Sequence, residues 1–165
     1  MMLRRIISAA GCLAVSIVAG IGLTGNALAE PFKDKSGRAV YVPVSVEDVK
    51  QPDGSIVRKQ SLTGISIADL PFPFDYVKHQ CTGTVHIAAD GKPGRAHGYC
   101  EVLSSKGDRG AFTYVGDVTG GRFAYIDGAG VAAYAGLKGE GTYKIKVGMP
   151  SGGIVTEWTA TWQTD

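Results

Sequence analysis

The sequence lacks the motifs that most often reveal a protein's activity. It contains no G-x-S-x-G elbow and no phosphate loop ending in Gly-Lys-Ser/Thr. Only three histidines and three cysteines occur among 165 residues, and no metal-ligand spacing is present. We therefore assign no catalytic residue, no metal and no cofactor, although a Ser-His-Asp set brought together only in space stays open.

The chain also lacks a surplus of charge once its first residues are set apart. Residues 1–29 combine two arginines, an apolar stretch over 6–23 and an Ala27-Leu28-Ala29 site, which is the pattern of a cleavable signal peptide. The 15 basic residues that remain balance 15 acidic ones, which argues against a nucleic-acid partner. A permanent membrane helix and lipidation at Cys12 are the alternatives. Glycines within the stretch oppose the first, and the short apolar segment before Cys12 opposes the second.

No second long apolar run follows, so we expect no membrane span after cleavage. The solvated composition of residues 30–37 predicts a flexible N-terminal tail, and residues 38–165 have the length of one domain. Removal of the leader implies a periplasmic or secreted protein.

A convincing helical period is missing as well, and short alternating runs separated by glycine-rich turns take its place. We expect strands over 40–46, 55–60 and 62–67, with a break or bend at Gly64. Turn signals recur every eight to twelve residues, which predicts an all-β fold: a small antiparallel up-and-down barrel of about eight strands. Outward charges on the last strands argue against the alternative, an outer-membrane barrel.

The last strand shows the alternation best, because it places both tryptophans on the inward face together with Ala160. The proline- and aromatic-rich segment 69–76 predicts a plug that closes one end of the barrel, with a lid over a ligand mouth as the alternative.

Residues 79–103 predict a hairpin with its turn near Asp90 and Gly91. In that register paired residue numbers add to 181, which sets Cys81 directly opposite Cys100. An exported chain forms disulfides, so we expect these two cysteines to be joined. The other face of the hairpin is polar, and its two histidines, His86 and His97, lie diagonally to each other. Two ligands are too few for a metal site unless other strands supply more.

The glycine pattern from residue 116 to 143 resembles that of a known group of proteins. The stretches are Gly128-Ala-Gly130, Tyr134-Ala-Gly136-Leu137 and Gly139-Glu-Gly141-Thr142-Tyr143, with a looser match over Gly116–Gly121. They resemble a G-T-G-[KR]-[FY]-x-G-x-x-G-x-G-x-[YW] stretch of allene oxide cyclase and dirigent-like small barrels, of the calycin class. Ala129 departs from that pattern, and Val131-Ala132-Ala133 adds a residue. The resemblance implies an eight-stranded barrel with an apolar pocket, often a homo-oligomer, and carries no activity over.

Our leading hypothesis is an exported barrel that binds a small apolar or aromatic molecule. The candidate ligand-binding residues combine polar groups of the hairpin with an inward aromatic set: Arg95, His97, Tyr99, Phe112, Tyr114, Tyr143, Trp158 and Trp162. The alternatives are a module that binds or inhibits an extracytoplasmic protein, and a cyclase or isomerase whose lumen holds Arg95, His97 and Tyr99. Whether the protein is an enzyme stays open, and the residues favour binding.

Overall fold

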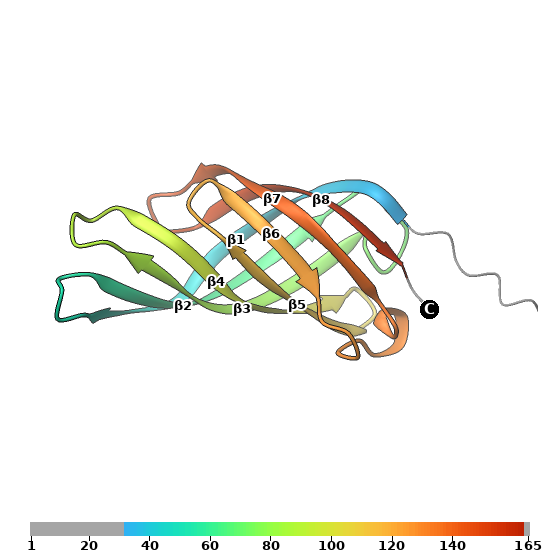
Figure 1. Ribbon diagram of the computed structural model, residues 1–165. Coiled ribbons are helices and arrows are strands. Elements are labelled where there is room, and N and C mark those ends of the chain that lie inside the picture. Colours follow the sequence, from blue (N-terminus) through green and yellow to red (C-terminus); the bar gives the residue numbers. More distant parts are fainter. Residues whose placement is uncertain (1–31, 164–165) are drawn as a thin grey trace, which may run out of the picture.

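The computed structural model describes residues 32–163, and they form a closed antiparallel barrel of eight strands joined in chain order (Figure 1). The predicted fold class is therefore confirmed. The signal peptide and its cleavage site lie outside the described residues. The strands and one 3₁₀ turn are β1 (Phe32–Lys50), β2 (Ile56–Ile67), β3 (Tyr76–Ile87), β4 (Pro93–Ser104), β5 (Arg109–Gly116), β6 (Gly120–Tyr125), η1 (Ala132–Tyr134), β7 (Lys138–Gly148) and β8 (Ile154–Gln163).

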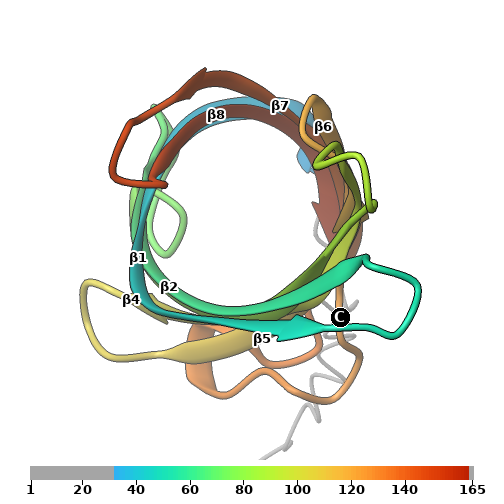
Figure 2. The same ribbon diagram turned by 90° about the vertical axis from the view of Figure 1, so that its left-hand side faces the viewer.

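Strand β1 closes the barrel because it pairs with β2 on one side and β8 on the other (Figure 2). It begins at Phe32, so the expectation of a flexible tail up to residue 37 is wrong for the described part of that segment. The physical reason is that Phe32 has partners: its ring stacks on Trp162 with centroids 6.1 Å apart. No helix among residues 32–163 is long and apolar enough to cross a membrane.

The expected break at Gly64 is absent, since β2 runs unbroken from Ile56 to Ile67. Gly64 pairs with Tyr41 of β1 and with His79 of β3. The glycine serves close packing instead of a bend, because a Cβ added there would lie only 2.5 Å from the Tyr41 ring.

The β3–β4 hairpin has the predicted register, with Cys81 paired to Cys100 and joined to it by a disulfide. Both cysteines are buried and face the barrel interior. The turn is longer than two residues, and a bulge follows Val85. The disulfide fits the oxidising environment that an exported protein meets.

One end of the barrel is filled, and the segment before β3 fills it. Phe74 of that segment is buried against Trp162, with ring centroids 4.6 Å apart, and against Tyr134. The Tyr134 hydroxyl donates a hydrogen bond of 3.0 Å to the Pro73 carbonyl. These contacts give the plug that the sequence predicted, at the right-hand end of Figure 1. The hairpin turns after β1, β3, β5 and β7 lie at the opposite end (Figures 1 and 2).

Candidate functional site

The barrel encloses a cavity of about 240 Å³ that runs from the plug toward the opposite end. Phe74 and Trp162 line its inner end, whereas Asp117 and Val118 of the β5–β6 turn line its outer end. Val118 is 50% exposed, so the outer end is the mouth. An engineered apolar cavity of about 150 Å³ is large enough to bind benzene. This lumen therefore has room for one or two aromatic rings.

The lumen stays open because its aromatic rings lie against the barrel wall over inward-facing glycines. A Cβ on Gly98 would lie 2.6 Å from the Tyr114 hydroxyl, and one on Gly121 would lie 2.9 Å from the Tyr143 hydroxyl. Each ring thus occupies the space that a side chain on the neighbouring strand would take. Other pairs of this kind are Tyr41 over Gly64, Phe123 over Gly141 and Trp158 over Gly37.

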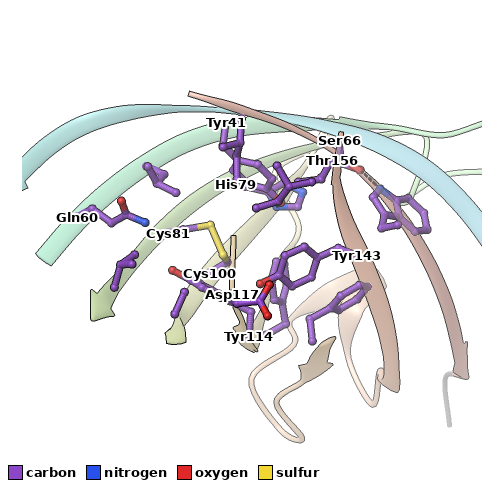
Figure 3. A pocket seen from close by; sticks show the side chains of 18 of the residues that line it. Tyr41, Gln60, Ser66, His79, Cys81, Cys100, Tyr114, Asp117, Tyr143 and Thr156 are labelled. Carbon is purple, nitrogen blue, oxygen red and sulfur yellow. Dashed lines mark hydrogen bonds between the residues drawn. A yellow bond between two sulfur atoms is a disulfide. The ribbon is translucent and has the colours of Figure 1, made fainter. Parts of the chain in front are cut away.

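The wall is mainly apolar and rich in aromatic rings, with polar groups set into it at intervals (Figure 3). Burial raises the pKa of Tyr143 to about 12, and it also raises the pKa values of Tyr114 and Tyr125. All three phenols therefore stay protonated at neutral pH. The lining residues of the described chain include no Lys, Arg or Glu. Asp117, at the mouth, is their one carboxylate, and His79 is their one imidazole. A thin polar pattern on an apolar wall is typical of small-molecule sites.

His79 is one of the buried polar residues of the lining, and it is only 7% exposed. The Tyr41 ring crosses over Gly64 to reach it, and the Tyr41 hydroxyl lies 3.0 Å from His79 Nδ1. Burial lowers the pKa of the His79 imidazole to about 4. His79 is therefore neutral at physiological pH, while its other ring nitrogen, Nε2, is buried without a hydrogen-bond partner.

The structure separates the candidate ligand-binding residues of the sequence into two groups. The inward aromatic set does line the cavity: Phe112, Tyr114, Tyr143, Trp158 and Trp162. The hairpin set of Arg95, His97 and Tyr99 faces outward. These residues are exposed because they alternate along β4 with inward-facing positions, such as the disulfide-bonded Cys100. The expectation that these three lie in the lumen is wrong. Whether the inward five hold a ligand stays a prediction.

Sequence reasoning missed Tyr41 and His79 as lumen residues. A signal for His79 was present, because it shares parity with Cys81 and so faces the same side of β3. No signal in the sequence joins Tyr41 to His79, since their contact depends on the pairing of β1, β2 and β3.

Comparisons with known proteins support the fold. No protein-family model matches the sequence, and no curated protein matches it. Among solved structures, the pterocarpan synthase dirigent protein GePTS1 superposes with a TM-score of 0.51 at 10% identity, over 79% of this chain and 88% of that one. The pterocarpan synthase dirigent protein PsPTS1 superposes with a TM-score of 0.52 at 11% identity, over 82% and 97%. The chain is similar in fold to these dirigent barrels, which agrees with the dirigent part of the resemblance in residues 116–143.

Proposed function

We propose that the mature protein is an exported barrel that binds a small, neutral, apolar or aromatic molecule in its lumen. The observation that carries this proposal is a cavity of about 240 Å³ walled by aromatic rings and left unfilled by any side chain. Interiors of proteins are normally close-packed and a cavity lowers stability, so a lumen of this size is better explained by a function than by packing. The similar dirigent barrels are named as pterocarpan synthases, which supports a ligand-binding role for the lumen here.

The two tryptophans of the chain report directly on this lumen, because Trp158 and Trp162 both line it. We expect naphthalene and coumarin, two fused-ring probes of matched shape, to change the tryptophan fluorescence of the mature protein in a saturable way. Calorimetric titration then gives the dissociation constants. If neither probe binds up to its solubility limit, the lumen is not a site for small aromatic molecules and the proposal fails.

A pair of matched variants locates the binding. Ala96→Phe places a ring in the lumen, since Ala96 lines the cavity near its mouth. Ala124→Phe places the same ring on the exposed outer face. We expect the first variant to lose binding and the second to keep it. Equal loss in both, or none in either, would place the probes elsewhere than the lumen.

Export of the protein to the periplasm or the exterior belongs to this proposal. It rests on the leader pattern of residues 1–29 and agrees with the Cys81–Cys100 disulfide. Self-association also belongs to the proposal, and it rests on the resemblance in residues 116–143. Mass spectrometry of the secreted chain tests the cleavage, because it should find Glu30 at the N-terminus.

A further inference from the structure

The deep end of the lumen holds hydrogen-bonding groups that the barrel leaves unused. Three buried side-chain polar atoms among the described residues have no partner, and two of them belong to residues that line the cavity: His79 Nε2 and Trp162 Nε1. An unpaired buried polar group destabilises the folded state, because it loses its hydrogen bonds to water. Such a group beside a cavity leaves a hydrogen-bonding role that a ligand or a water molecule can fill.

The contact with Tyr41 decides which hydrogen-bonding role is open at His79. If the Tyr41 hydroxyl donates to Nδ1, the ring carries its proton on Nε2, and one group is left unpaired. If Nδ1 instead donates to the phenol oxygen, both the Tyr41 hydroxyl proton and the Nε2 lone pair are left unpaired. The first arrangement leaves fewer unsatisfied groups in a buried site, so Nε2 is assigned as an N–H donor.

The other partners of His79 are aromatic. Its ring meets Phe112 edge to face with centroids 5.6 Å apart, and Tyr41 in the same manner at 5.4 Å. Trp162, the second residue with an unpaired atom, can only donate through its indole nitrogen. An acceptor oxygen therefore suits this end of the lumen. A charged ligand does not suit this end, because no charged side chain of the lining lies there to pair with it. The one acidic lining residue, Asp117, lies at the mouth.

We propose that the inner lumen binds neutral aromatic carbonyl compounds, with the carbonyl oxygen accepting a hydrogen bond from His79 Nε2 and the rings packed along Phe112. This inference rests on the proposed lumen site and adds the chemical class of its ligand. Tyr41 is a positioning residue in it, because its hydroxyl fixes the imidazole tautomer.

The test compares coumarin, which has a lactone carbonyl, with naphthalene, which has two fused six-membered rings as well but no oxygen. We expect calorimetry to show that the mature protein binds coumarin about 10-fold more tightly than naphthalene, in line with one well-placed hydrogen bond to a buried donor. His79→Phe keeps a ring and removes the donor, so the preference should disappear while naphthalene binding remains. His79→Gln restores an N–H donor and should return part of the preference.

His97→Phe is the matched control, because His97 is exposed on the outer face and should leave the preference unchanged. Equal affinity for both probes in the wild type, or a preference that survives in His79→Phe, would overturn this inference while the lumen site itself stands. Binding of neither probe would overturn both. The His79 imidazole ¹⁵N resonances give a separate readout: Nε2 should carry the proton in the wild type, and a lone pair there would contradict the assignment.

Discussion

The buried His79 makes the stability of the barrel depend on pH. Its pKa is about 4 in the folded protein, against an ordinary value of about 6.5, because burial disfavours the charged imidazolium. Between these two values the unfolded chain binds a proton that the folded chain does not. Stability contributed by neutral His79 is therefore fully present above pH 6.5, falls as the pH is lowered, and reaches its minimum below about pH 4.

The size of the effect follows from the same shift. At pH 5 the unfolded histidine is almost fully protonated and the folded one is mostly neutral, so His79 alone should cost about 2 kcal/mol relative to pH 7. No other group against the imidazole changes its charge in this range, because Phe112 is apolar and burial raises the pKa of Tyr41.

Urea denaturation of the oxidised mature protein at pH 7 and pH 5 measures this cost. Other titrating groups also contribute, so His79→Gln is the reference, since glutamine is polar and does not titrate. The free energy of unfolding should fall by about 2 kcal/mol more in the wild type than in His79→Gln. His97→Gln, on the outer face, should follow the wild type. If wild type and His79→Gln lose the same stability on acidification, His79 is not held neutral by burial and the reasoning is refuted.

Three further predictions concern the scaffold. Replacing Cys81 and Cys100 with alanine should lower the free energy of unfolding by about 3 kcal/mol, the cost expected for opening a loop of this length; a midpoint of denaturation that does not move would contradict it. Gly98→Ala should cost about 1–3 kcal/mol because its Cβ collides with backbone and the Tyr114 hydroxyl, whereas Gly148→Ala, with open space around it, should be near neutral in the same thermal melt; equal melting temperatures would refute the account of the wall. Tyr134→Phe removes the hydrogen bond to the plug segment and should cost about 1 kcal/mol, with faster amide exchange confined to that segment; unchanged exchange there would show that the bond does not hold the plug.

Much of the fold could be predicted from the sequence, because its signals were local. Alternation on β8 placed Trp158 and Trp162 on the inward face, and that placement holds. The Asp90-Gly91 turn signal set a register that paired Cys81 with Cys100. Alternation and turn chemistry depend on residues close in the chain, so both can be derived without the tertiary structure.

The lumen chemistry was harder to predict, because alternation shows that a strand has two faces without showing which one turns inward. On the β3–β4 hairpin the polar face, with His97 and Tyr99, looked more functional than the face of cysteines and glycines. The structure turns the small face inward, since Gly83 and Gly98 leave room there for the Tyr114 ring. A ring that fills the space above a neighbouring strand's glycine is a non-local contact, so no single segment of the sequence displays it.

The central claim is that the lumen receives a ligand at its deep end. A crystal structure of the mature protein with coumarin tests it most directly. We predict the rings inside the barrel, beside Phe112, and the carbonyl oxygen within about 3 Å of His79 Nε2. Coumarin on the outer face near His97 and Tyr99, or a lumen that stays free of it in crystals of a protein saturated with the probe, would contradict the claim.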